Sequence, residues 1–294
     1  MKQLFFLMLV AAAITSCSSD DDGTCPDGPD LNATSEIKFN TNVYGVSTKA
    51  PVTPTTSINS VFVASSATGN YSTYLWSDTV TFTASPTPTT GLSFTPSRYY
   101  PVDNSSVFIK AYYPESPAAI TNNIVTYAAT DGSVDLLMTP EVSGTRTSSP
   151  LNFVFAHLLS QLQFQFVAGT GFPTGKTVTT LKIKNAQTFP TQLDLNTGIV
   201  SYSTSNITFS GKSYSIASPG SPITDFPMVA PGQSVVLSIT TSDGVTYPDF
   251  TVPTLTTVVG QSHLITITFN ITEIKINVSV TNWVTGPGGT SSVA

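Results

Sequence analysis

Charged side chains, cysteines and histidines are all scarce in this chain of 294 residues. Asp, Glu, Lys and Arg make up 10% of it, with 11 basic residues against 17 acidic ones and a formal net charge of −6. Nucleic acids are bound by clustered Lys and Arg, so this balance excludes a nucleic-acid partner. The two histidines, His157 and His263, have no Cys, Asp or Glu cluster at metal-ligand spacing. We therefore expect no metal site and no cofactor.

Catalytic signatures are missing as well. The chain contains no Gly-x-Ser-x-Gly nucleophile elbow and no zinc-protease helix. Amphipathic helical spacing is not sustained anywhere along the sequence. These absences favour a binding or structural protein, and we expect no enzymatic activity.

Short alternating runs of Thr, Val, Ile, Phe and Tyr begin near residue 36 and continue to the end of the chain. Pro, Gly, Asn and Asp clusters separate them, which is typical of β-strands joined by turns. The pattern predicts an all-β protein. Its length and its 40% hydrophobic content favour two domains with ample cores. The Thr/Ser/Pro-rich stretch 139–150 is the best linker, so we expect domains at 36–146 and 147–294.

Two phase changes in the apolar alternation predict where the chain changes direction. Large apolar residues occupy odd positions in 151–155 and even positions in 162–166. Successive side chains point to opposite faces of a strand, so this flip needs a bulge, a bend or passage between sheets. A second flip separates 265–271 from 274–280. There we expect a hairpin or kinked strand that closes the second domain, with apolar positions Ile274, Ile276, Val278 and Val280.

The first residues have the pattern of a secretory signal, with Lys2 before an apolar run at 4–14 that is too short to span a bilayer. Residues 14–17, Ile-Thr-Ser-Cys, resemble the lipobox of bacterial lipoproteins, in which the Cys thiol receives a diacylglyceryl group and becomes the new N-terminus. We therefore expect a signal peptide at 1–16 and lipidation of Cys17, which leaves Cys25 without an intramolecular disulfide partner. An ordinary secretory signal with a chance Cys is the alternative.

Residues 17–35 are expected to form a lipidated flexible tether. Their Ser-Ser-Asp-Asp-Asp run at 18–22 resembles the signal that sends lipoproteins of Bacteroidetes to the outer face of the outer membrane. A solvated acidic linker is the alternative. A triacylated Cys anchors a protein stably, so we expect a surface-exposed lipoprotein of the cell outer membrane.

Four segments carry a family likeness. They are Ile109-Lys110-Ala111-Tyr112-Tyr113-Pro114, Val134-Asp135-Leu136-Leu137-Met138, the run 151–162, and Val278-Ser279-Val280-Thr281-Asn282-Trp283. In order and spacing, behind a lipobox, they resemble the fimbrillin (Mfa-like) family of Bacteroidetes lipoproteins. The resemblance implies two tandem transthyretin-like β-sandwich domains. It also implies a structural, anchor or tip/adhesive subunit of type V fimbriae, with other fimbrillin subunits as partners.

The resemblance further implies assembly by β-strand addition. Family pilins lose an N-terminal strand to an Arg-specific protease and accept a strand from the next subunit. Here Lys49 stands in place of the expected Arg, and Pro51 directly after Ala50 would hinder many proteases. Lys49 is thus the candidate maturation site, and 274–280 is the candidate donor or closing strand. The chain could also keep its first strand as a lipid-anchored subunit, or act as a stand-alone adhesin.

Two further features suggest a connection with sugars. Asp78-Thr79-Val80 fits the short O-glycosylation pattern of Bacteroidetes, with Thr79 as the acceptor. Aromatic residues could form a stacking platform for host or bacterial surface glycans: Tyr71, Tyr74, Trp76, Tyr99-Tyr100 and Tyr112-Tyr113. Strand alternation directs only one member of each adjacent pair outward, and packing in a core is the alternative. The second hypothesis is therefore a stand-alone glycan-binding lipoprotein of the outer membrane.

Overall fold

The computed structural model describes residues 35–43, 57–83, 89–92, 94–114, 122–148, 150–271 and 274–282. These residues form β-strands, turns and irregular segments, with no helix among them. No helix in this part of the chain is long and apolar enough to cross a membrane. The prediction of an all-β protein is confirmed.

The strands divide among four sheets. Their bounds are β1 Phe39–Val43, β2 Ser57–Ser66, β3 Trp76–Thr83, β4 Thr89–Leu92, β5 Val107–Tyr113, β6 Ile124–Thr126, β7 Leu137–Met138, β8 Val142–Gly144, β9 Leu151–His157, β10 Ser160–Ala168, β11 Thr177–Ile183, β12 Pro190–Asp194, β13 Val200–Tyr202, β14 Ile207–Ser215, β15 Met228–Val229, β16 Ser234–Thr241, β17 Thr246–Thr256, β18 Gln261–Phe269 and β19 Ile274–Asn282.

The first sheet has eight strands in the order β3-β2-β5-β7-β9-β1-β4, with β8 paired to β5 beside this path. Strand β1 runs parallel to β9 and antiparallel to β4. Alternate side chains of β1, β2, β5 and β9 meet in one core, as the period-2 apolar pattern requires. Its fully buried members include Ile37, Phe39, Val61, Val63, Ile109, Phe153 and Phe155.

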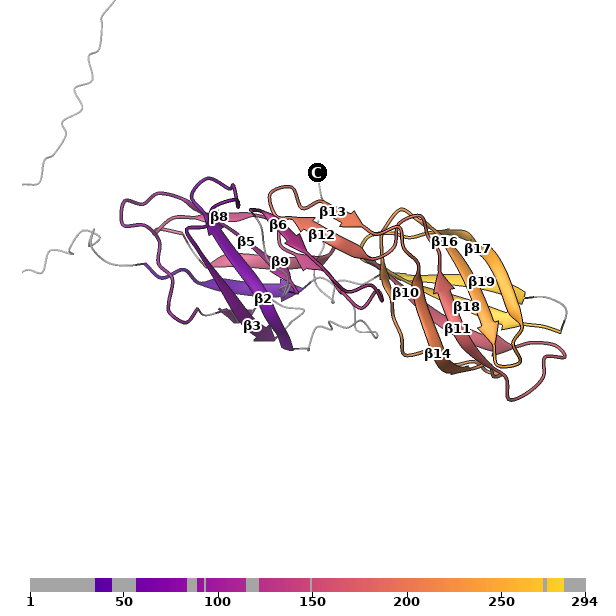
Figure 1. Ribbon diagram of the computed structural model, residues 1–294. Helices are drawn as coiled ribbons and strands as arrows, with labels where there is room; N and C mark the ends of the chain where they lie inside the picture. Colours follow the sequence, from indigo (N-terminus) through magenta and orange to yellow (C-terminus); the bar gives the residue numbers. More distant parts are fainter. Residues whose placement is uncertain are drawn as a thin grey trace, which may run out of the picture. The chain divides into compact units, whose positions relative to one another are not determined.

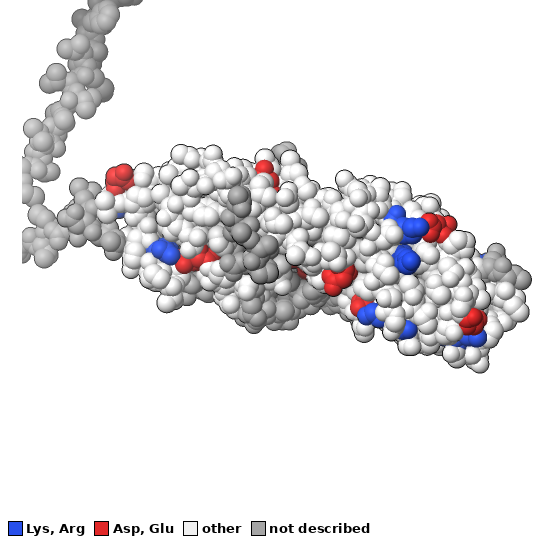
Figure 2. Space-filling model, viewed as in Figure 1, with Lys and Arg blue, Asp and Glu red and all other residues white. Residues whose placement is uncertain are grey.

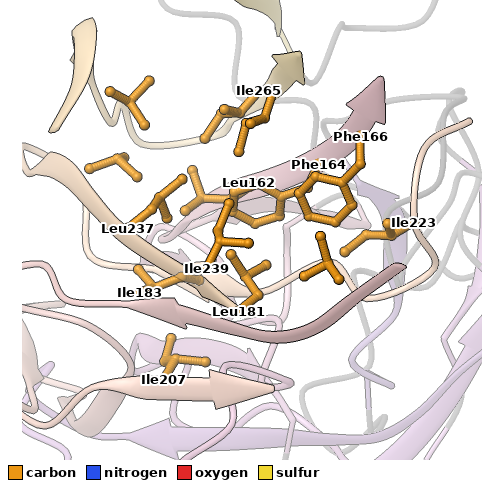
Figure 3. Close-up of a cluster of buried hydrophobic side chains, with 14 of the residues drawn as sticks. Leu162, Phe164, Phe166, Leu181, Ile183, Ile207, Ile223, Leu237, Ile239 and Ile265 are labelled. Atoms are coloured by element: carbon orange, nitrogen blue, oxygen red, sulfur yellow. The ribbon is translucent and has the colours of Figure 1, made fainter. Parts of the chain in front are cut away.

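Two four-stranded sheets, β15-β10-β18-β19 and β14-β11-β16-β17, pack face to face around a second core (Figure 1). In Figure 3, side chains of β10 point toward those of β11 and β16. The parallel pair β10 and β18 runs in register from Gln161 opposite Ser262 to Ala168 opposite Phe269. Their inner faces are mainly apolar, with His263 opposite Leu162 and six fully buried apolar side chains: Leu162, Phe164, Phe166, Ile265, Ile267 and Phe269.

A three-stranded sheet, β13-β12-β6, covers the other face of the first sheet. Side chains of β2 and β5 on that face, Phe62 and Tyr112, pack with Val125 of β6 and Leu193 of β12. Strand pairing therefore joins residues on both sides of position 147, since β6 pairs with β12 and β9 lies in the first sheet. The division into 36–146 and 147–294 stays a prediction.

Both predicted phase changes correspond to changes of strand. Between His157 and Ser160 the chain leaves the eight-stranded sheet and enters a four-stranded one, so the flip marks passage between sheets. The second flip lies between β18 and β19, which form an antiparallel pair with Phe269 opposite Ile274 and Ile265 opposite Val278. The expectation of a hairpin there is confirmed.

The two histidines are buried parts of the structure. A hydrogen bond joins His157 Nδ1 and Asp135 Oδ1 at 2.8 Å, and both side chains are buried. The backbone N–H of Val258 donates to Nε2 of His263 at 3.3 Å. Among the described residues, no three His, Cys, Asp or Glu side chains gather as a metal site would require.

His263 should make the protein less stable in mild acid. Burial lowers the pKa of its imidazole, so the folded protein holds it neutral while the unfolded chain takes up a proton below about pH 6.5. Protonation would also place a hydrogen on Nε2, which accepts from Val258. We expect the free energy of unfolding to fall as the pH drops from 7 to 5, with a contribution from this group of at most about 1.4 kcal/mol per pH unit.

Urea titrations of the wild type and His263→Gln at several pH values would measure this effect. The stability difference between the two proteins should shrink as the pH falls through 6.5. A difference that stays constant over that range would contradict the prediction.

The charged side chains of the described residues are few and scattered over the face displayed in Figure 2. Several form ion pairs, among them Lys212 with Asp225 and Lys176 with Asp243. Thr and Ser occupy many of the outer strand positions instead, where they keep a high β-propensity without charge.

Candidate assembly site

Strand β1 fills the position between β4 and β9, and it is the central element of the candidate assembly site. Its register with β9 runs from Phe39 opposite Leu151 to Val43 opposite Phe155. On its other side, Phe39 to Thr41 pair with β4. Just before the strand, the N–H of Ile37 donates to the carbonyl of Arg98 at 2.8 Å. Both edges of β1 are therefore hydrogen-bonded.

Alternate side chains of this segment enter the first core. Ile37, Phe39 and Thr41 are each at most 2% exposed. The ring of Phe39 stacks on Phe153 of β9, with centroids 4.1 Å apart, and meets the ring of Phe94 edge-on at 5.7 Å. Offset stacked and edge-to-face rings contribute beyond the area they bury. Phe39 is thus the main anchor of β1.

Arg98 connects β1 with the opposite edge of the same sheet. Its carbonyl accepts from Ile37, while its guanidinium forms a two-pronged ion pair with Asp78 of β3, at 2.6 and 2.9 Å. The hydrogen bond to Asp78 raises the pKa of Arg98. The guanidinium also lies over the indole of Trp76 at 5.5 Å. These contacts fix the segment that precedes β5 against β1.

The connection of β1 to the rest of the chain runs through residues 44–56, which fall outside the described residues. Lys49, the candidate maturation site, belongs to this segment, and Cys17 likewise falls outside the described residues. Noncovalent contacts alone would hold β1 in place if the chain were cut between β1 and β2.

The candidate donor or closing residues lie on β19. This strand ends the order β15-β10-β18-β19, so it pairs with β18 on one edge only among the described strands. Ile274, Ile276 and Val278 are partly buried and pack against the second core, while Val280 is 53% exposed. The free edge of β19 presents backbone groups that another strand could pair with.

Thr79 lies on β3, at the edge of the eight-stranded sheet, and its side chain is exposed. It is 30 residues from Lys49 and far from β19 in the sequence. Its neighbour Asp78 is held in the ion pair with Arg98.

Most of the aromatic residues considered for a sugar-stacking platform pack in or against the cores, which is the alternative given for them. Tyr99 is half exposed and Tyr100 is buried, as alternation predicts, but Tyr71 and Tyr112 are both fully buried. The prediction that one member of the pair Tyr112-Tyr113 points outward is wrong, because β6 and β12 cover the face that sequence alternation assigned to solvent. Tyr113 packs against the first core from the opposite face.

A buried lysine, which the sequence reasoning missed, holds β12 against the first sheet. Lys110 of β5 is 8% exposed, and its Nζ donates to the carbonyls of Leu195 at 2.8 Å and Asn196 at 3.1 Å. Burial lowers the pKa of this amine. The signal was present in the strand, because Lys110 is the single charge in an apolar run between Phe108 and Tyr112.

Comparison with known proteins shows which family has this arrangement. The family model described as fimbrillin-like matches residues 48–283. The chain belongs to the fimbrillin-like family. This is a structural, non-enzymatic family, so the expectation that the protein is not an enzyme is confirmed.

One relative of this fimbrillin is a Bacteroides uniformis protein named "Putative fimbrium subunit Fim1C". The two are 25% identical over 98% of this chain and 97% of the relative. Two solved structures share the fold. One is a "putative cell adhesion protein" of Bacteroides uniformis, with a TM-score of 0.60, 18% identity, and coverage of 85% of this chain and 100% of that one. The other is a fimbrial protein of Bacteroides vulgatus, with a TM-score of 0.51, 15% identity, and coverage of 84% and 99%.

Proposed function

We propose that this fimbrillin is a surface-exposed, lipid-anchored subunit of fimbriae that assembles by β-strand addition. The described sheets would belong to two tandem transthyretin-like β-sandwiches, divided near residue 147, with β9 and β12 pairing across that division. The observation that carries the proposal is β1: its side chains fill the first core from between two strands. Among the described residues, hydrogen bonds to β4 and β9 and packing in the first core hold β1 in the sheet. A strand of another subunit could replace it at the same position.

A replacing strand would need apolar side chains at alternate positions to match those of β1. Residues 274–280 have this pattern, with Ile274, Ile276, Val278 and Val280 on alternate positions. Backbone hydrogen bonds to β4 and β9 would supply affinity, and the side chains that enter the core would set the register. Lys49 remains the proposed cleavage site for release of β1, and Thr79, exposed on β3, remains the proposed O-glycosylation site.

Deletion of residues 272–294 should abolish the detergent-resistant ladders that a strand-exchanged polymer forms, because it removes the proposed donor strand. The first core should stay folded, which protection of β9 amides from hydrogen exchange would show. Deletion of 283–294 alone, which spares β19, is the matched control and should keep the ladders. Ladders that survive the longer deletion would refute strand donation by the C-terminus.

Cys17→Ala should release the protein from the outer membrane or leave it uncleaved at the inner membrane, because the lipidated thiol is the proposed anchor. Cys25→Ala is the control and should fractionate like the wild type. The readout is cell fractionation with intact-mass analysis of the recovered N-terminus. A lipidated terminus at Cys17 fits an anchored subunit, whereas a terminus near Ala50 fits proteolytic maturation. Normal retention of Cys17→Ala in the outer membrane would refute the anchor.

A further inference from the structure

We propose that the loop between β2 and β3 is a binding site for the ring of a neutral sugar. A pocket of about 300 Å³ opens there, and the described residues that line it all belong to the segment 66–75. This volume is at the lower end for ligand pockets, so it suits one or two sugar rings and not a longer chain. The site is separate from β1 and β19, so it goes beyond the assembly role and stands without it.

The loop is held in shape before any ligand binds. Tyr71 at its centre is fully buried, and its backbone N–H donates to Oδ1 of Asn196 at 2.8 Å. Its hydroxyl donates to the carboxylate of Glu141 at 3.0 Å. Lys110 lies over its ring at 5.1 Å. Contacts from three different parts of the chain thus fix the middle of the loop.

Hydrogen bonds within the segment fix its two ends. The hydroxyl of Ser66 donates to the carbonyl of Asn70 at 2.7 Å and accepts from the N–H of Thr68 at 3.2 Å. The N–H of Leu75 donates to the carbonyl of Ser65 at 2.9 Å. A pocket that is already ordered binds small ligands without the entropic cost of ordering a loop.

The lining has the chemistry that recognises a sugar. Thr68 and Thr73 present hydroxyls that no described hydrogen bond uses, and Asn70 adds an amide. Leu75 is 53% exposed and lies beside Tyr74, so the pocket also has an apolar part for the C–H face of a sugar ring. The hydroxyl of Tyr74 is buried and has no hydrogen-bond partner among the described residues.

Charge decides which sugars can bind. None of the described residues that line the pocket is charged, so they offer no partner for a carboxylate or sulfate. The carboxylate of Glu141 lies against Gly69 of the loop and would repel an anion. The expected ligand is therefore a neutral hexopyranose or N-acetylhexosamine, and sialic acid should be excluded.

Saturation-transfer NMR on the mature protein would test the proposal, with the methyl glycosides of mannose, galactose, glucose and N-acetylglucosamine as probes and N-acetylneuraminic acid as the anionic comparison. We expect a dissociation constant on the order of 1 mM for at least one neutral sugar, as is typical for a ligand of about a dozen heavy atoms. The absence of binding by every neutral probe at roughly 50 mM would overturn the proposal. So would preferential binding of the anionic sugar.

Two variants would locate the binding. Thr73→Val combined with Leu75→Ser removes an unused hydroxyl and the exposed apolar surface, and it should weaken binding at least about tenfold. Both residues lie on the surface, so the melting temperature should not change. Val259→Ser is the matched control, since Val259 is an equally exposed apolar residue in the turn before β18. Equal affinity of the double variant and the control would overturn the assignment of the site.

Discussion

Replacing Phe39 with alanine is expected to lower the free energy of unfolding by about 3–5 kcal/mol, the range for truncation of a buried phenylalanine. The ring is 1% exposed and contacts the rings of Phe153 and Phe94. Alanine would leave a cavity beside Phe94 and Phe153, and these two rings would lose their contact with residue 39. Urea unfolding at pH 7 would measure the loss.

Asn40→Ala is the matched control for Phe39→Ala, because Asn40 is the next residue of β1 and points to the opposite face. Its side chain donates to Oδ1 of Asn152 at 3.1 Å on the surface, so the expected loss is below about 1 kcal/mol. Phe39→Leu should lie between the two. A loss below about 1 kcal/mol for Phe39→Ala would mean that β1 contributes little to the first core.

Lys110→Ala is expected to cost about 3 kcal/mol of stability. The substitution leaves the carbonyls of Leu195 and Asn196 without their donor in a buried site, and it removes the cation from the ring of Tyr71. Because Lys110 joins β5 to the chain after β12, the three-stranded sheet should loosen first. Hydrogen exchange at Tyr127, whose N–H donates to the carbonyl of Thr191 between β6 and β12, would report this.

Lys182→Ala is the control for Lys110→Ala, since Lys182 is an exposed lysine on the strand β11. Its loss should stay within about 0.5 kcal/mol. Lys110→Met keeps the aliphatic stem and should be less harmful than alanine. Equal stability of the Lys110→Ala and Lys182→Ala variants would show that the buried amine of Lys110 does not hold the three-stranded sheet against β5.

The sequence predicted the strands themselves and two of their connections. Strict alternation identified β9, β10, β18 and β19, and the phase change near residue 158 indicated the passage between sheets. This works because alternation reports which face of a strand is buried. Alternation does not report which other strand a given strand pairs with.

Partners were not predictable where pairing is remote in sequence or where both faces of a strand are covered. Strand β1 pairs in parallel with β9, which lies more than a hundred residues later, and nothing in either segment specifies the other. The alternation of β5 suggested one solvent face, yet β6 and β12 cover it. For that reason the sequence left Tyr112 as a candidate for sugar stacking, whereas the pocket that we propose as a sugar site lies in a polar loop without a strand pattern.

The parallel pairing of β10 with β18 has a consequence for the order in which the chain folds. Synthesis delivers β10 about a hundred residues before its central partner, and pairing over such a separation is slow. Until β18 arrives, the edge of β10 from Gln161 to Ala168 lacks the strand with which it pairs. A nascent chain interrupted before residue 261 would therefore expose an unpaired strand edge, which favours aggregation. Addition of β18 and β19 is thus the folding step that protects this protein from aggregation.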